Sequence, residues 1–321
     1  MWLWVTFILF VFFLLALDLG IFHRKTRTIA LKEALILSAG WIGVALAFNV
    51  LIFFLYENHW FGLDLAESEP DGRTAAVLFL TSYLIEKSLG LDNLFFIALI
   101  FSYFRIPIAY QHRVLYWGLV GAVIMRAAMI LAGTALIERV DWILNLFGAF
   151  LIVSGVRMAL VGHPPDLETN PIIIWIRQLF PVLPKLAGER FAVRREGQLV
   201  LTPLALALIM IETSDLIFAL DSLPAIFSIT RDSFLVFTSN IMAVLGLRSL
   251  YFALAGAVDR FRYLRTSLGL LLVLIGIKLL LKDVLVEGPI TVFLTLGAVA
   301  IILASGIIAS LLFGKRAPDC S

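Results

Sequence analysis

Long runs of apolar residues, divided by short polar stretches, extend from one end of the chain to the other. An α-helix rises about 1.5 Å per residue, so roughly 20 apolar residues cross the hydrocarbon core of a bilayer. The pattern predicts a single integral membrane domain over residues 1–321, an all-α polytopic bundle of about nine transmembrane helices. The predicted spans are 3–22, 34–56, 75–104, 114–137, 142–160, 199–229, 234–257, 266–282 and 289–313.

Composition supports a membrane protein and argues against several classes of enzyme. Hydrophobic residues make up 61% of the 321 residues and charged residues 15%, whereas soluble domains are about 45–50% apolar and about 25% charged. No phosphate-binding GxxxxGK[ST] loop and no HExxH motif occurs in the chain. We therefore expect no enzyme, no cofactor and no nucleic-acid partner. Cys320 is the single cysteine of the chain, so we expect no thiolate metal site.

Lysine and arginine concentrate in every second connection between the predicted spans. The positive-inside rule then places the N-terminus outside and the C-terminus in the cytosol. The early apolar run is followed by basic residues, not preceded by them, which is typical of a retained helix and not of a cleaved signal. The rich connections and the tail carry Arg24, Lys25, Arg27, Lys32, Arg105, Arg113, Arg177, Lys185, Arg190, Arg194, Arg195, Arg260, Arg262, Arg265, Lys315 and Arg316.

The fifth connection, residues 161–198, is the only sizeable polar segment. Two apolar stretches flank Glu196-Gly197, a pattern that predicts a short β-hairpin. The segment is too small for an enzyme domain, and we interpret it as a cytoplasmic connector between two halves.

The two halves resemble each other. Asn93 precedes Arg126 by 33 residues, and Asp215 precedes Arg248 by 33 residues. A Gly-x6-Gly pattern follows each arginine, at Gly148 and again at Gly269. Residues 75–160 are thus predicted to repeat as residues 199–282. Because each copy has three spans, the second copy crosses in the opposite sense, which is a feature of transporters with a midplane substrate site.

Six carboxylates lie inside the apolar runs, where each costs at least about 2.5–3.5 kcal/mol at a helix centre. Either buried ion pairs with Lys87, Arg126 and Arg248 or a bound cation would compensate them. With Asn93 and nearby hydroxyls, they would form an all-oxygen site that suits Mg²⁺, Ca²⁺ or Mn²⁺ better than Zn²⁺ or Cu⁺. The acids are Asp18, Glu86, Asp92, Glu212, Asp215 and Asp221, and the hydroxyls are Ser88, Thr213, Ser214 and Ser222.

The spacing of these acids constrains the helices that carry them. At 100° per residue, Glu212 and Asp215 share one helical face, but Asp221 lies on the opposite face. We therefore predict that spans 75–104 and 199–229 are kinked or interrupted near the acids, with Gly90 and Pro224 as break points. Asp18 is expected either to join the site or to contact water near the cytoplasmic end.

The motif Glu86-Lys-Ser-Leu-Gly-Leu-Asp92-Asn93, together with Glu212-x-Ser-Asp215-Leu-Ile-Phe-Ala-x-Asp221-Ser-x-Pro224, resembles the TerC family of integral membrane proteins. So does Thr238-Ser-Asn240-x-x-Ala-x-Leu-Gly-Leu-Arg248. The resemblance implies a bacterial inner-membrane protein linked to tellurite or alkaline stress, export of manganese, and ancestry shared with LysE-type exporters. It also implies that the six intramembrane acids belong to the site.

Two functions remain open on the sequence. One is a divalent-cation exporter, most fittingly for Mn²⁺, that works by alternating access with protons as the coupling ion. The other is a membrane scaffold or assembly factor for stress responses, in which the acids form structural ion pairs. A membrane-embedded enzyme, such as a metal-dependent phosphotransferase, is a further alternative.

Overall fold

A computed structural model describes residues 2–22, 31–58, 60, 70–139, 142–160, 171–195, 198–254, 262–281 and 289–313. Each of the nine predicted spans corresponds to a helix or, in one case, to a pair of helices. The elements are α1 (Trp2–Phe22), α2 (Leu31–Glu57), α3 (Gly72–Tyr103), α4 (Ile108–Arg139), α5 (Ile143–Leu160), α6 (Pro171–Leu179), β1 (Ala192–Arg195), β2 (Gln198–Leu201), α7 (Pro203–Phe227), α8 (Ser233–Leu245), α9 (Leu247–Leu254), α10 (Arg262–Leu280) and α11 (Pro289–Phe313).

The outer surface of the bundle is apolar. Within the described residues, six helical segments are long and apolar enough to cross a membrane, and two shorter apolar helices accompany them. Large hydrophobic side chains such as Phe12, Ile36, Val153 and Leu294 are exposed on helices at the edge of the bundle. An apolar surface of this extent is unfavourable in water but favourable in contact with the hydrocarbon of a lipid bilayer. The chain is therefore an all-α membrane protein.

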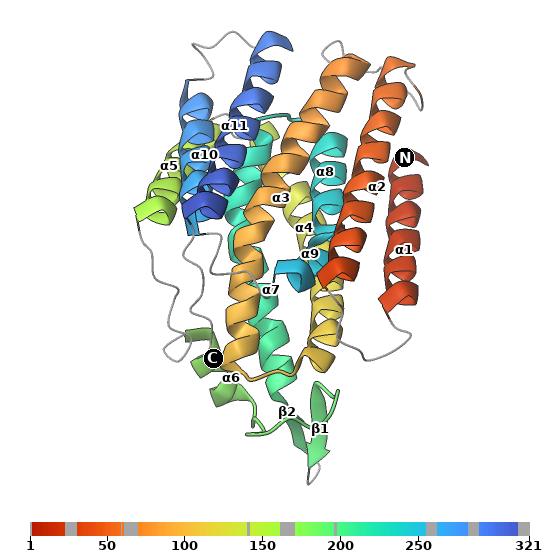
Figure 1. Ribbon diagram of the computed structural model, residues 1–321, viewed down its shortest axis with the longest axis vertical. Coiled ribbons are helices and arrows are strands. Elements are labelled where there is room, and N and C mark those ends of the chain that lie inside the picture. The colour runs from red at the N-terminus through yellow and green to blue at the C-terminus, as the bar shows by residue number, and fades with distance from the viewer. Residues whose placement is uncertain are drawn as a thin grey trace.

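Helices α3 and α8 form the centre of the bundle. Helix α3 packs against α2, α7, α8, α9 and α11, while α4 packs against α7 and α8. Every residue of α8 from Phe234 to Leu245 is buried. Figure 1 shows α1 and α2 on one side of this centre and α5, α10 and α11 on the other. Glu86 on α3, Arg126 on α4 and Asp215 on α7 are consequently buried among other helices.

Helices α5 and α10 pack along each other through pairs of glycines. A Cβ on Gly155 would lie 2.5 Å from the carbonyl oxygen of Gly269, and a Cβ on Gly148 would lie 3.0 Å from that of Gly276. The reverse substitutions, at Gly269 and Gly276, would meet the carbonyls of Gly155 and Gly148 at 2.6 and 2.7 Å. Small residues allow such close backbone approach, which is a common mode of helix packing in membranes.

Of the two predicted alternatives for α3 and α7, kinked or interrupted near the acids, the interruption is wrong, and the kink stays a prediction. Both helices are continuous through Gly90 and up to Phe227. Helix α3 accommodates its 32 residues, roughly 48 Å in length if straight, as one uninterrupted helix. Pro224 lies only three residues before the end of α7, so few helical hydrogen bonds depend on it. The break occurs instead at Gly246, between α8 and α9, inside the predicted span 234–257.

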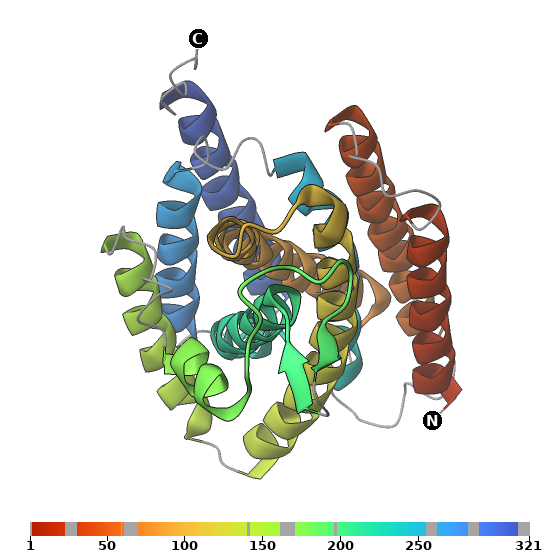
Figure 2. The same ribbon diagram turned by 90° about the horizontal axis from the view of Figure 1, so that it is seen from below.

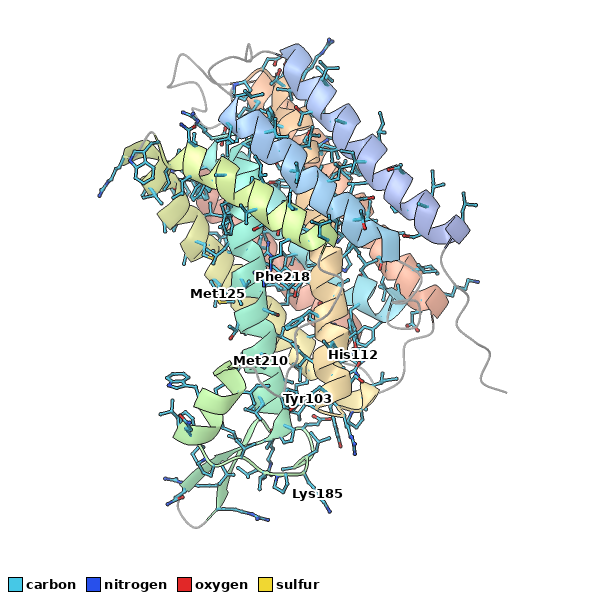
Figure 3. The ribbon with its side chains drawn as sticks, turned by 90° about the vertical axis from the view of Figure 1, so that its left-hand side faces the viewer. Tyr103, His112, Met125, Lys185, Met210 and Phe218 are labelled. Atoms are coloured by element: carbon cyan, nitrogen blue, oxygen red, sulfur yellow. The ribbon has the colours of Figure 1, made fainter. Side chains whose placement is uncertain are left out.

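The connector projects from one end of the bundle. Strands β1 and β2 pair antiparallel, with Ala192 opposite Leu201, and this confirms the predicted hairpin. The hairpin and α6 cover the end of the bundle in Figure 2, and Lys185 marks this end in Figure 3. The N-terminal end of α1 lies away from it (Figure 1). The sequence did not predict α6.

Candidate functional site

The guanidinium of Arg126 lies at the centre of a buried polar cluster. Arg126 is on α4, and its Nε and Nη2 donate to the two carboxylate oxygens of Asp215 on α7, at 3.3 and 3.0 Å. Its Nη1 donates to Glu86 on α3 and, at 3.0 Å, to Oδ1 of Asn240 on α8. One arginine thereby joins four helices. Glu86 and Arg126 are each only 2% exposed, so these charges stand apart from solvent.

Asn93 completes the cluster from α3. Its Nδ2 donates to Oδ1 of Asp215 at 3.0 Å. Asn93 and Glu86 are seven residues apart, nearly two helical turns, and therefore lie on the same face of α3. The carboxylate of Asp215 accepts from both Asn93 and Arg126, which holds it in one orientation.

Among the described side chains of the cluster, buried oxygens without a donor outnumber buried donors without an acceptor, of which Nδ2 of Asn240 is one. Oε2 of Glu86, Oδ1 of Asn93 and Oε2 of Glu212 are buried and have no hydrogen-bond partner among the described residues. A buried oxygen without a donor is energetically unfavourable, by about 1–3 kcal/mol in mutational data. Three such oxygens around one buried ion pair indicate that the cluster can accept a further positive group.

Glu212 lies against a glycine of α4. A Cβ on Gly121 would lie 2.0 Å from Oε1 of Glu212, so the carboxyl group occupies space that any larger residue at position 121 would fill. Glu212 and Asp215 do share one face of α7, as predicted, and both point to α4.

Asp18 and Arg248 form a separate buried ion pair, with 3.4 Å between Oδ2 of Asp18 and Nη1 of Arg248. Asp18 is 1% exposed, so it does not contact water as one of the two expectations held. The pair joins α1 to α9, which helps to attach α1 to the bundle.

Lys87 makes a different contact from the ion pair proposed for it. Its Nζ donates to the backbone carbonyl of Ala243 at 3.0 Å, and within the described part of the chain no carboxylate pairs with it. Ala243 lies near the C-terminal end of α8, where carbonyl oxygens without helical partners favour a positive charge.

Two predicted acids remain outside this description. Asp92 and Asp221 belong to α3 and α7, but their side chains are not among those that the structure describes. Among the described side chains, no group of three or more His, Cys, Asp or Glu residues gathers closely enough to hold a metal. The hydroxyls of Ser88, Thr213 and Ser214 each donate to a carbonyl of their own helix.

Sequence reasoning missed Asn240 and Gly121 as site residues. Asn240 lies within a span otherwise rich in apolar residues, eight residues before Arg248, and a lone amide in such a run is a usable signal. Gly121 carried no signal, because its importance comes from a side chain on another helix.

A cavity adjoins the cluster. It is lined by Asn93, Asp215 and Arg248 together with apolar residues that include Ile97, Leu115 and Gly118. On α3, α4 and α7 these residues lie toward the ends marked by Tyr103, Ile108 and Pro203. Figure 3 shows Tyr103, His112 and Met210 nearer to Lys185 of the connector than Met125 and Phe218 are. The cavity therefore lies on the connector side of Asp215.

Comparison with known proteins agrees with the motifs. Residues 71–318 match the family described as "Integral membrane protein TerC family". The chain is 43% identical over 317 residues to "Uncharacterized membrane protein STKORF319" of Myxococcus xanthus, covering 98% of this chain and 94% of that protein. It is 43% identical over 283 residues to the "Putative membrane-bound redox modulator Alx" of Escherichia coli K12, covering 88% and 86%.

A third relative, an "Uncharacterized membrane protein" of Rickettsia bellii, is 38% identical over 310 residues, or 96% of this chain and 97% of that one. No solved structure matches the chain. The family match covers most of the chain, and the matched residues include those that form the Arg126 cluster. The protein belongs to the integral membrane protein TerC family.

Proposed function

We propose that this protein exports a divalent metal cation from the cytosol through the Glu86–Asp215 cluster. The observation that carries the proposal is the surplus of buried oxygen acceptors around Arg126, on Glu86, Asn93 and Glu212. A protein with only a structural ion pair has no need of unpartnered oxygens in its interior.

The donor set selects the class of cation. Carboxylate and amide oxygens suit hard divalent ions, namely Mg²⁺, Ca²⁺ and Mn²⁺. The choice of Mn²⁺ among these follows from the resemblance to the TerC family. A site lined by carboxylates repels tellurite anions, so a link to tellurite would be indirect.

The direction of transport rests on charge. Exposed basic residues at the connector end, including Arg105, Arg113 and Arg190, favour a cytosolic location for that end. The N-terminus would then be outside and the C-terminus inside, in a bacterial inner membrane. The cavity would open toward the cytosol and admit the cation to Asp215, and protons moving inward would be the coupling ion.

Reciprocal contacts support the inverted repeat that alternating access requires. The repeat alignment makes Gly148 equivalent to Gly269 and Gly155 equivalent to Gly276. In the structure each glycine approaches the equivalent of the other: Gly148 lies near Gly276, and Gly155 lies near Gly269. An exchange of this kind is what a two-fold axis between two copies produces. A LysE-like exporter architecture is part of the same proposal.

The scaffold alternative has one observation in its favour. Glu86, Asp215 and Asp18 all have arginine partners, as structural ion pairs would. The name "Putative membrane-bound redox modulator" of the Alx relatives is also compatible with a role other than transport. This chain has one cysteine, so no dithiol can form within it.

Efflux measurements separate these functions. In cells that lack their own manganese exporter, we would compare intracellular Mn²⁺ for the wild type, Asp215→Asn and Glu86→Gln at equal membrane levels. Glu189→Gln, which removes an exposed partner of Arg113, is the control for a lost carboxylate. Mn²⁺ should fall with the wild type and the control only.

Other outcomes are equally informative. A fall in Ca²⁺ or Mg²⁺ in place of Mn²⁺ would keep the exporter and change its cargo. If no cation level changes and the Asp215 and Glu86 variants behave as the wild type, the scaffold alternative replaces the exporter.

A further inference from the structure

We propose that Arg126 is a tethered counter-ion, which occupies the carboxylates of the empty carrier and must be displaced when the cargo cation binds. The inference rests on the proposed function. It adds that Arg126 sets the affinity of the exporter for its cation and the rate of transport. It is carried by the contacts of one side chain with acceptors on three other helices.

The guanidinium occupies oxygens of the type that a divalent cation would use. It contacts both oxygens of Asp215, one of Glu86 and the amide oxygen of Asn240. These are hard oxygen ligands that converge from α3, α7 and α8. A cation placed between them would therefore compete directly with Arg126 for the same lone pairs.

The charges of the cluster are not balanced. Within the described residues, two carboxylates, Glu86 and Asp215, face one guanidinium, which leaves one negative charge in excess. A divalent cation in place of the guanidinium would neutralise both carboxylates. Burial makes uncompensated charge costly, so the excess negative charge favours the binding of a further cation.

The arginine also leaves acceptors unused. Glu86 is 2% exposed and Asn93 is 4% exposed, yet Oε2 of Glu86 and Oδ1 of Asn93 have no donor among the described residues. A planar guanidinium directs its donors along a fixed fork and does not reach them. A spherical cation that accepts six or more oxygen ligands has no such restriction.

The cavity provides a route that does not pass through the arginine. Asp215 both accepts from Arg126 and lines the cavity, and Ala122, one turn before Arg126 on α4, lines it as well. A cation arriving through the cavity thus meets Asp215 and Asn93 first. Once the cation has bound the oxygens that Arg126 contacts, we expect the guanidinium to move toward the cavity space beside Ala122.

Arg248 offers the matched comparison. It holds the corresponding position in the second sequence repeat and is buried, and its Nη1 lies 3.4 Å from Oδ2 of Asp18. Replacing Arg248 removes a second buried arginine and leaves in place the bonds of Arg126 to Glu86 and Asp215. A change in cation binding that occurs in Arg126 variants and not in the Arg248 variant therefore indicates an effect on the oxygens that Arg126 contacts.

The experiment measures equilibrium Mn²⁺ binding by the full-length protein in detergent, from the electron paramagnetic resonance signal of free Mn²⁺. We would compare the wild type, Arg126→Gln, Arg126→Lys and Arg248→Gln. Removing a competing ligand should tighten binding by about tenfold or more in Arg126→Gln, within the usual range of coupling between two ligands. Arg126→Lys, which keeps the charge but has fewer donors, should bind with intermediate affinity, and Arg248→Gln should bind no more tightly than the wild type.

Transport in proteoliposomes gives the second readout. Arg126→Gln should transport at least about tenfold more slowly despite its tighter binding, because the empty carrier keeps uncompensated buried carboxylates. A purely structural arginine would not tighten Mn²⁺ binding when it is removed.

Four outcomes decide the matter. Tighter binding with slower transport supports the inference. Unchanged or weaker binding by folded Arg126 variants overturns it, while the exporter stands if the wild type still binds and moves Mn²⁺. If Arg126→Gln aggregates, the affinity of Arg126→Lys decides in the same way. If no protein in the set binds or moves Mn²⁺, calcium or magnesium, the proposed function itself fails.

Discussion

The side-chain amide of Asn93 donates a 3.0 Å hydrogen bond to Oδ1 of Asp215, and these are the two residues that the repeat alignment pairs with each other. They are 122 positions apart in the chain. Arg126 and Arg248 are separated by the same number; Arg126 donates to Asp215, and Arg248 forms an ion pair with Asp18. The two sequence repeats therefore meet at this bond, but the charges around it are asymmetric.

Exchanging the two residues tests this relationship. Asp215→Asn alone should reduce Mn²⁺ transport by about 10–100-fold, as the loss of a ligand or its partner commonly does. The double variant Asn93→Asp/Asp215→Asn restores one carboxylate and keeps an amide–carboxylate hydrogen bond across the interface. Proteoliposome transport should then lie between the single variant and the wild type. A double variant no better than Asp215→Asn would show that the carboxylate must lie on α7.

Gly121 should be required for function more than for stability. A Cβ there would lie 2.0 Å from Oε1 of Glu212, and the flexible end of the glutamate can move away at small energetic cost. We expect Gly121→Ala to fold, to melt near the wild-type temperature, and to lose about tenfold or more of its transport rate through a displaced carboxylate.

Gly43→Ala is the control for this substitution, because a Cβ on Gly43 has no atom within 4 Å. It should match the wild type in melting temperature and transport. Wild-type transport by Gly121→Ala would remove Glu212 from the site.

The glycines between α5 and α10 should be required for stability. A Cβ on Gly155 would meet the carbonyl oxygen of Gly269 at 2.5 Å, and backbone cannot yield as a side chain can. Overpacking of this kind usually costs about 1–3 kcal/mol. Thermal unfolding of Gly155→Ala in detergent should show this loss, while Gly297→Ala, at a position with nothing within 4 Å, should not. An unshifted Gly155→Ala would mean that the two helices separate readily.

The cavity should be accessible from the connector side. Gly118 lines it, and a Cβ there would make only ordinary contacts, 3.5 Å from Ile211 and 3.9 Å from Leu208. In a Cys320→Ser background, the thiol of Gly118→Cys should react with a membrane-impermeant reagent in inside-out vesicles. Labelling should be slow in right-side-out vesicles.

Excess Mn²⁺ should slow labelling of Gly118→Cys if the cation enters through this cavity. Labelling at equal rates from both sides, or only from outside, would contradict the location that we assign to the cavity.

The helices and the connector hairpin could be predicted because they depend on local patterns. Apolar runs of about 20 residues can satisfy their backbone only as helices in a bilayer, and the turn at Glu196-Gly197 separates two short apolar stretches. The interruption could not be located in this way. Gly90, Pro224 and Gly246 are all reasonable break points by composition, and only the packing of α8 and α9 selects Gly246.

The candidate site could be predicted as a set of residue types but not as an arrangement. Charged residues in apolar runs identify themselves, because lipid makes each of them costly. Whether Arg126 pairs with Glu86 and Asp215, or Arg248 with Asp18, depends on which helices are neighbours. That choice involves residues up to 230 positions apart, and no local pattern encodes it.

The sequence by itself thus determined that this is a membrane protein of the TerC family with acids, amides and arginines in its interior, since those properties follow from composition, hydropathy and motifs. Only the tertiary structure decided that Asn240 and Gly121 belong with the acids, that Lys87 binds a backbone carbonyl, and that Arg126 leaves oxygens of Glu86 and Asn93 without donors. Those facts are distances between helices, and the distances are set by how all the helices pack at once.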